Sequence, residues 1–476
     1  MPSELAAACL TTLMRKPVTI PRAVRCSTLI LLSLVTWFWQ PPSLAAEGWK
    51  AGVAKTNITP DRPMWMAGYA SRDHIVEGKL HDLWAKALVL EDSSGQRGVL
   101  ITLDLIGVDR PLSTSICNRL IERHGLKREQ IAINCSHTHS GPVVARNLRP
   151  MHYLMLADDQ KQLIDAYATF LEDRVLAVVD EALKNLAPST VAWGSGQATF
   201  ATNRRNNPEP RVPELREQGR LLGPVDHAVP VLSVRSPAGK LRAVAFGYAC
   251  HATVLSGYQW SGDYPGVAQL EVEKRHPDAI ALFWAGCGGD QNPIPRRMVE
   301  LAQQYGEALA AAVDEVLQAP MSPVAGELGA SYQEIDLPLG KLPTRSELEQ
   351  DAQSKDKYIA ARAKTLLEDL QAGGELPASY PYPIGIWQLG PEVTWVFLGG
   401  EVVVDYALRL KAELSGNKTW VAGYSHDVMA YIPSRRVLLE GGYEGGGAMV
   451  YYGLPSTWSP EVEERIVGEV QRQGAR

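Results

Sequence analysis

The sequence contains few cysteines, and their spacing argues against two common kinds of site and scaffold. Only 6 of the 476 residues are cysteine, which is too few for a fold held together by disulfides. No Cys-x-x-Cys pair occurs, which argues against a zinc site built from thiolates. Cys9 and Cys26 belong to the N-terminal segment described below. The sequence leaves open whether the other four form disulfides: Cys117, Cys135, Cys250 and Cys287.

Charge of one sign is not concentrated in any part of the chain. The formal net charge is -6, from 47 Lys and Arg against 53 Asp and Glu that are scattered along the sequence. No stretch interleaves basic residues with aromatic ones, so we expect no nucleic-acid partner. A composition of 45% hydrophobic and 21% charged residues is typical of a globular protein with a sizeable core.

Residues 1–46 differ from the rest and predict a secretory signal peptide. Four basic residues precede the mostly apolar run 26–39, and small residues follow at 43–46. A membrane anchor is the alternative, but this run is too short to span a bilayer of roughly 30 Å. No later stretch is apolar enough to cross a membrane. We therefore expect export, either to the periplasm or out of the cell, with a mature chain that begins near residue 47.

Apolar patterns predict alternating strands and helices. We expect strands at 49–60, 83–91, 98–105, 131–135, 229–234, 241–249 and 279–284, and helices at 112–123 and 158–186. This order predicts the α/β class, with mixed sheets and flanking helices. Two polar stretches interrupt it: 202–223, expected as a long surface loop, and 344–371, expected as a solvated helical excursion. No linker composition marks a boundary, so we expect one composite domain over 47–476.

The strongest local signal is the segment 136–142 (SHTHSGP), which contains His137 and His139. It directly follows the predicted buried strand 131–135. Residues two apart on an extended chain point to the same side, so both imidazoles would face one pocket. Neutral histidine nitrogen is a common zinc ligand. A pair of hydrogen-bonded turn histidines would give the same pattern, and this segment alone leaves both interpretations open.

Three further positions follow predicted strands, where α/β folds usually place their sites. His251 follows the strand 241–249, and Asp263 lies in the next loop. The loop 285–293 is rich in glycine, which would let backbone amides approach a ligand closely. Each position also has a purely structural interpretation: a core histidine, a turn-capping aspartate and a tight turn.

Taken in chain order, these segments resemble the neutral/alkaline (non-lysosomal) ceramidase family. The matching motifs are Asn-Ile-Thr-Pro at 57–60, Met-Ala-Gly-Tyr at 66–69, His-Thr-His-Ser-Gly-Pro at 137–142, Asn203-Arg204, His251, Gly400-Glu401, Tyr-Ser-His at 424–426 with Tyr431, Tyr443-Glu444 and Tyr452-Gly453. They run from about residue 51 to 455 in the family's order, so chance is a poor explanation.

The resemblance implies a zinc-dependent hydrolase with four metal ligands: His137, His251, Glu401 and Tyr431. Two nitrogens and two oxygens suit zinc, and their wide spacing in the chain implies a single composite catalytic domain. His139 and Arg204 resemble positions that meet the substrate and stabilise the oxyanion. The implied activity is cleavage of an amide (N-acyl) bond by metal-activated water. The implied substrate is a lipid, as in sphingolipid metabolism, or a smaller amide, and the resemblance leaves room for contact with a membrane surface.

Two departures limit what the resemblance implies. The family reads Gly-Asp-x-Ser-Pro where this sequence has 289–293 (GDQNP), so Asn292 replaces a serine assigned to catalysis or substrate contact. Asparagine is not a nucleophile, but its amide can donate or accept a hydrogen bond, and we still expect Asn292 in the catalytic site. The family also carries a C-terminal β-sandwich, for which we expect no room here. The resemblance therefore covers the N-terminal catalytic domain and does not imply ceramide specificity.

Two other functions fit the same residues. One is a metal-dependent esterase or other hydrolase that acts on a non-ceramide substrate. The other is a catalytically silent binding protein with the same fold, which the missing serine motivates. Metal content and turnover on amides and esters distinguish the three.

Overall fold

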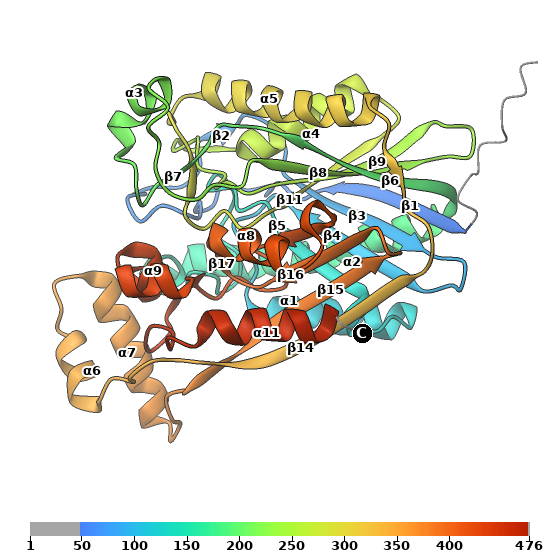
Figure 1. The fold of residues 1–476 in the computed structure, drawn as a ribbon. Coiled ribbons are helices and arrows are strands. Elements are labelled where there is room, and N and C mark those ends of the chain that lie inside the picture. The colour runs from blue at the N-terminus through green and yellow to red at the C-terminus, as the bar shows by residue number, and fades with distance from the viewer. Residues whose placement is uncertain (1–47, 475–476) are drawn as a thin grey trace, which may run out of the picture. The chain divides into compact units, whose positions relative to one another are not determined.

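A nine-stranded sheet and a four-stranded sheet pack face to face between layers of helices (Figure 1). The computed structural model describes residues 48–474. The predicted signal peptide lies outside these residues, and the domain boundary near residue 47 stays a prediction. Over the described range, no helix combines the length and apolar character that a membrane span needs.

The large sheet has the strand order β11-β9-β8-β6-β1-β3-β4-β5, with β13 beside β6. Its strands are β1 Trp49–Asn57, β3 Trp84–Glu91, β4 Arg97–Leu103, β5 Ile131–Cys135, β6 Ala187–Gln197, β8 Ala228–Arg235, β9 Leu241–Tyr248, β11 Ile280–Ala285 and β13 Ser322–Pro323. All seven predicted strands are confirmed to within a few residues, whereas β6 and β13 were not predicted. The pairs β4–β5 and β9–β11 are parallel, and the other pairs in this order are antiparallel.

Both faces of this sheet are buried, because side chains alternate between two apolar layers. On β3, Ala85, Ala87 and Val89 pack towards helices, whereas Leu88 and Leu90 pack towards the second sheet. The covering helices are α1 Arg110–His124, α2 Asp158–Lys184, α4 Asp263–Arg275 and α5 Val299–Gln318. The first two confirm the predicted helices, and α1 ends as expected at Gly125, whose φ is 64°.

The second sheet has the order β14-β15-β16-β18. Its strands are β14 Leu328–Pro338, β15 Ser379–Leu389, β16 Val393–Leu398 and β18 Thr419–Ala422. On β16, Trp395 and Phe397 pack against the large sheet, whereas Val396 and Leu398 pack under the helices α8 Val404–Glu413 and α11 Val462–Gly474. The predicted fold class, mixed sheets with flanking helices, is confirmed.

The expectation of a long loop at 202–223 is wrong in part. The segment β7 Ala201–Asn203 begins it, and α3 Val212–Glu217 lies within it. Asn203 and Asn207 are buried because their side chains bond to backbone carbonyls. Polar composition suggested exposure here, but asparagine can be buried when its amide is paired.

The predicted helical excursion at 344–371 is confirmed as two helices, α6 Arg345–Asp351 and α7 Lys357–Gln371, which extend from the second sheet (Figure 1). Asp356 caps the second helix and separates it from the first. The pair has a small core of its own, formed by Leu348, Ala363 and Leu366. The four cysteines of the described chain, which the sequence left open, are all buried and free.

The two end strands of the large sheet, β5 and β11, meet at Asn134. The Asn134 side chain accepts a hydrogen bond from Ala285 N at 2.8 Å and donates one to Gly423 O at 2.7 Å. Strands that are far apart in the sheet order are thereby joined at their carboxyl ends. The segments that follow β5, β9, β11 and β16 meet at this place, where the predicted site residues lie.

Candidate metal centre

Two buried histidines, His137 after β5 and His251 after β9, face one carboxylate. Their Nε2 atoms lie 3.1 Å and 3.0 Å from the same oxygen, Oε2 of Glu401. Glu401 begins β17 Glu401–Val402, which pairs in parallel with β19 Tyr431–Ile432. This register sets Tyr431 beside Glu401, and its hydroxyl lies 3.2 Å from His251 Nε2. The structure therefore brings the four predicted ligands together.

Backbone carbonyls fix which nitrogen of each ring carries the hydrogen. His137 Nδ1 donates to Ile106 O at 2.6 Å, and His251 Nδ1 donates to Gly288 O at 2.7 Å. A carbonyl only accepts, so in each neutral ring the lone pair is on Nε2. Burial and then the nearby Arg204 charge lower the pKa of His251 to about 4, which keeps this ring neutral near pH 7.

Two nitrogen lone pairs thus face the Glu401 carboxylate. Lone pairs and a carboxylate oxygen repel one another unless a cation lies among them, and such carbonyl-oriented histidines are typical of metal sites. Ligand atoms around a tetrahedral zinc with bonds of about 2.0 Å would be about 3.3 Å apart. The observed contacts of 3.0, 3.1 and 3.2 Å fit a metal ion of this size.

A second donor set overlaps the first. The ligand nitrogens of His137, His139 and His251 all lie within 4.8 Å of one another. This set keeps two of the predicted ligands and replaces both oxygens by His139. Both ring nitrogens of His139 are buried without a hydrogen-bond partner, so the ring is available to a metal or to a substrate.

The expectation that an extended chain aims His137 and His139 to one side is wrong in its geometry. His137 has a φ of 60°, in the left-handed region. Its amide donates to Leu105 O at 2.9 Å, and the His139 amide donates to Ala252 O at 3.2 Å. The rings still meet, with centroids 4.9 Å apart, because a turn takes the place of the extended chain.

Arg204 and Asn292 lie beside each other because β7 pairs with β12 Gln291–Pro293. Arg204 donates from Nη1 to Asn292 Oδ1 at 3.2 Å, from Nη2 to the Tyr431 hydroxyl at 3.1 Å and from Nε to Glu444 Oε1 at 2.6 Å. Burial would lower the pKa of Arg204, but Tyr431 and Glu444 hold it well above its usual value. All seven predicted site residues therefore belong to one cluster.

Two residues of the cluster were not assigned a role from the sequence. Glu444 binds both Arg204 and Arg205, each at 2.6 Å. Tyr452 donates a hydrogen bond to Glu401 Oε1, the oxygen that does not face the histidines. Both residues lie in motifs that carry the family resemblance, which was the only signal that could have found them.

The glycine-rich loop and Asp263 have structural roles. A Cβ on Gly289 would lie 2.7 Å from Glu401 O, and one on Gly288 would lie 2.8 Å from Cys250 N. Glycine therefore lets this loop pass between the segments that carry Glu401 and His251. Asp263 accepts hydrogen bonds from Leu255 N and Tyr264 N, so its turn-capping interpretation is supported.

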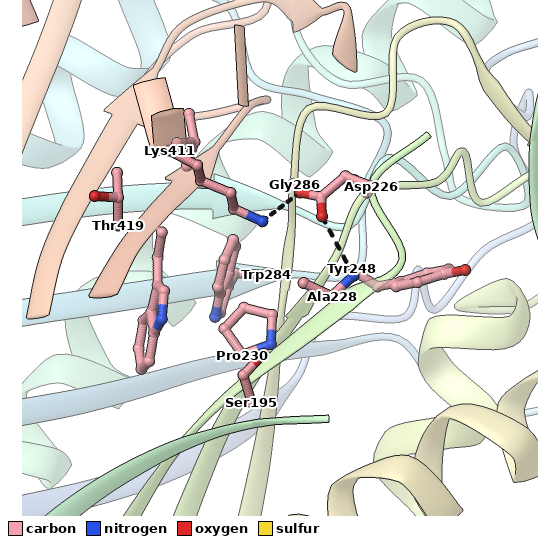
Figure 2. A pocket seen from close by; sticks show the side chains of 12 residues that line it. Ser195, Asp226, Ala228, Pro230, Tyr248, Trp284, Gly286, Lys411 and Thr419 are labelled. Carbon is pink, nitrogen blue, oxygen red and sulfur yellow. Dashed lines mark hydrogen bonds and ion pairs between the residues drawn. The ribbon is translucent and has the colours of Figure 1, made fainter. Parts of the chain in front are cut away.

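A small cavity lies between the two sheets (Figure 2). It is lined in part by Trp284, Trp420 and the ion pair of Lys411 with Asp226, which measures 2.6 Å. Its volume of about 20 Å³ has room for one water molecule. No predicted site residue lines it.

The sequence matches a family of known proteins over more than half of its length. Residues 49–327 match the sequence family described as neutral/alkaline non-lysosomal ceramidase, N-terminal. The chain belongs to this family. The matched range includes the five site residues up to Asn292, whereas Glu401 and Tyr431 lie beyond it.

Curated relatives match over short stretches. Neutral ceramidase 2 of Arabidopsis thaliana is 33% identical over 94 residues, which cover 19% of this chain and 12% of the relative. Neutral ceramidase A of Dictyostelium discoideum is 25% identical over 252 residues, covering 48% of this chain and 34% of the relative. The chain thus spans about a third or less of these relatives in the alignments.

The fold of the family is shared over most of the chain. The crystal structure of neutral ceramidase from Pseudomonas aeruginosa superposes with a TM-score of 0.66 at 19% identity, over 89% of this chain and 73% of that one. The structure of a ceramidase complexed with C2 superposes with the same score at 17% identity. At these identities the similarity establishes the fold alone.

Proposed function

We propose that the protein is a zinc-dependent hydrolase that cleaves an amide (N-acyl) bond. The observation that carries the proposal is the approach of two carbonyl-oriented histidines to one Glu401 oxygen. His137, His251, Glu401 and Tyr431 would hold the metal. Family membership supports the amide as the bond that is cleaved.

Zinc would supply a Lewis acid that lowers the pKa of water towards 7 and polarises a carbonyl, as zinc does in hydrolases. In the overall reaction one water molecule is consumed, the C–N bond breaks, and a carboxylic acid and an amine are released. Arg204, held by Glu444, presents a fixed positive charge beside Tyr431. Such a donor stabilises negative charge that develops on the carbonyl oxygen.

His139 and Asn292 would act on the substrate directly. Burial lowers the pKa of His139 well below its usual range, so the ring is neutral and can accept a hydrogen bond from the substrate at one free nitrogen and donate one from the other. Asn292 receives Arg204 on Oδ1, which leaves its amide hydrogens for a substrate oxygen.

Metal analysis of purified protein tests the proposal. We expect about one zinc per chain, lost in His137→Ala and Glu401→Ala and retained in the surface control His74→Ala. Zinc that remains bound in His139→Ala would support His137, His251, Glu401 and Tyr431 as the ligands. Zinc that is lost in this variant would support the set of three histidines. Protein that binds no metal would contradict the proposal.

Turnover on a panel of N-acyl-sphingosine, shorter N-acyl amines and the matching esters tests the reaction. Hydrolysis of amides is expected, and hydrolysis of esters alone would favour a metal-dependent esterase. Bound zinc with no turnover would favour the binding protein, which Asn292 in place of the family's serine motivates.

Export is part of the proposal, because residues 1–46 have the pattern of a signal peptide. N-terminal sequencing of the protein from its native host is expected to find a chain that begins near residue 47. A chain that retains the first residues would contradict export by cleavage.

A further inference from the structure

A polar cavity of about 520 Å³ lies against Arg204 and Asn292. Its lining includes three arginines, three glutamates and two asparagines, and its only larger apolar side chains are Pro208, Ile294 and Tyr443. An alkyl chain in this cavity would be stabilised little. It would remove water from the polar side chains of the lining without giving them new hydrogen-bond partners. The part of a substrate that enters this cavity is therefore polar.

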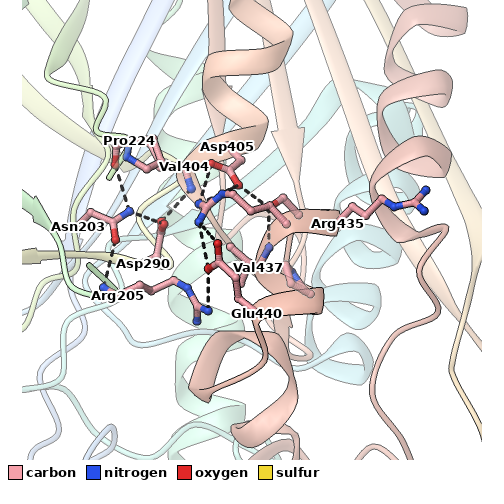
Figure 3. A network of polar contacts seen from close by, with 12 residues as sticks. Asn203, Arg205, Pro224, Asp290, Val404, Asp405, Arg435, Val437 and Glu440 are labelled. Carbon is pink, nitrogen blue, oxygen red and sulfur yellow. Dashed lines mark hydrogen bonds and ion pairs between the residues drawn. The ribbon is translucent and has the colours of Figure 1, made fainter. Parts of the chain in front are cut away.

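The carboxylates that line the cavity are already paired. Both oxygens of Glu444 accept from Arg204 and Arg205. Glu440 accepts from Arg205 on Oε2 and from Arg436 on both oxygens, within the network that also fixes Asn203 and Asp290 (Figure 3). The acceptors of these two residues are thus engaged by the protein itself.

Glu209, the third glutamate, is shared by two arginines. Arg296 donates to its Oε2 from Nε at 3.1 Å and from Nη2 at 2.7 Å, and Arg297 donates to Oε1. Two arginines therefore share this one carboxylate, although only Arg296 lines the cavity. The Arg297 side chain is 57% exposed, so its pairing is open to solvent.

Hydrogen-bond donors, in contrast, remain free. Among the described residues, Arg296 Nη1 and Asn292 Nδ2 have no partner. Asn292 is fixed in this orientation because the Arg204 guanidinium only donates and so selects Oδ1 as its acceptor. A cavity with free donors and engaged acceptors is complementary to an anion rich in acceptor atoms.

We propose that this cavity binds a carboxylate on the substrate, which makes the substrate class N-acyl amino acids or similar acidic amides. The inference rests on the proposed amide hydrolysis. Asn292 donates to an oxygen near the scissile bond, and Arg296 binds the carboxylate further along the cavity. The replacement of serine by asparagine at 292 then serves selection of the substrate.

Matched amide pairs test the inference on the zinc-loaded protein. N-octanoylglycine and N-octanoylpropylamine have the same acyl chain and differ chiefly in the carboxylate. We expect kcat/KM to be about tenfold or more higher for the acid, the factor that one charge-assisted hydrogen bond supplies. Octanedioic acid mono(propylamide) carries the carboxylate on the acyl side, so its turnover shows which side of the amide enters the cavity.

Two variants with opposite expected effects distinguish a loss of carboxylate binding from general damage to the fold. Arg296→Gln is expected to reduce the acid-to-neutral ratio about tenfold. Glu209→Gln frees both arginines and is expected to raise that ratio. Arg119→Gln, which removes an arginine on the surface of α1, is the control and should leave the ratio unchanged. The inference would be overturned if neither Arg296→Gln nor Glu209→Gln altered the acid-to-neutral ratio.

Failure of the inference differs from failure of the proposed function. Equal turnover of acid and neutral amides, or preference for N-acyl-sphingosine, would overturn the carboxylate site and support the amide hydrolase. If zinc-loaded protein cleaves no amide, the proposed function fails. Calorimetry with N-octanoylglycine then still tests the site, because binding that Arg296→Gln weakens supports it and absence of binding overturns it.

Discussion

Tyr452 donates its hydroxyl hydrogen to Oε1 of Glu401 and thereby leaves Oε2 to face His137 and His251. Burial and the Glu401 charge raise the pKa of Tyr452 well above its usual value, so the hydroxyl remains a donor near neutral pH. A partner of this kind orients a metal ligand without touching the metal. Tyr452 is therefore a positioning residue of the proposed metal centre.

The change Tyr452→Phe tests this role. It keeps the ring and removes the hydrogen bond, so Glu401 can rotate and metal affinity is expected to fall about tenfold or more, as for other partners of metal ligands. Competition with a chelator measures the affinity. Tyr451→Phe is the matched control, because the Tyr451 hydroxyl makes no hydrogen bond among the described residues. Equal affinities in the two variants would contradict the role.

The buried Glu444 carboxylate is expected to contribute strongly to stability. Its side chain is 4% exposed, and its partners Arg204 and Arg205 are 19% and 10% exposed. Burial would raise the pKa of Glu444, but Arg204 holds it below its usual value. Glu444→Ala leaves two arginines without this partner, and removal of one member of a buried ion pair costs about 3–5 kcal/mol. Urea unfolding measures the loss.

Glu440→Ala provides the comparison for Glu444. Its side chain is 42% exposed, and exposed ion pairs contribute about 1 kcal/mol or less. Losses of similar size in the two variants would show that burial is not the reason for the effect.

Much of the sheet could be predicted from the sequence, because its strands have regular apolar patterns. Leu88 and Leu90 alternate with Ala87 and Val89, and the structure buries both sets. The position of His137 after β5 was predictable for the same reason. The two-residue strands β17 and β19 were not, since two residues carry no period. Their pairing nevertheless places Tyr431 beside Glu401.

The long-range closure of the site could not be predicted from local pattern either. Asn134 reads as an interruption of an apolar strand, yet it joins β5 to β11. Glu401 and Tyr431 were named through family resemblance alone, and their roles as ligands stay predictions. The polar segment 202–223 looked like a loop because composition does not reveal that Asn203 pairs with the buried Asp290 at 2.8 Å.

Asp427 is expected to make stability depend on pH. Burial raises its pKa to about 7, although a hydrogen bond from Tyr380 opposes the rise. In the unfolded chain the value is about 3.9. Between these values the folded state holds a proton that the unfolded state has lost, so stability falls as pH rises from about 4 to about 7. The full effect, on the order of 4 kcal/mol, is present above pH 7.

Asp427→Asn removes this titration and keeps an oxygen that can accept from Tyr380. We expect the variant to have a higher Tm than the unchanged protein at pH 8, with a difference that narrows as the pH is lowered to 5. Asp278→Asn, at a side chain that is 67% exposed, should show no such trend. A difference in Tm that is the same at both pH values would rule out Asp427 as the titrating group.

Gly68 is expected to be required for the position of His139. Its φ is 101°, and a Cβ there would lie 2.5 Å from Cγ and Nδ1 of the His139 ring. Gly68→Ala must therefore displace the ring, and a misplacement of about 1 Å in a catalytic group can lower the rate about a hundredfold. The expected result is a large fall in kcat with zinc content retained.

Gly95→Ala distinguishes the effect of backbone strain from the effect of a steric clash with a neighbouring side chain. Gly95 also has a positive φ, 86°, but nothing lies within 4 Å of its Cβ position. It should lose about 1 kcal/mol of stability and keep kcat, whereas a similar fall in kcat in both variants would show that backbone strain alone is responsible.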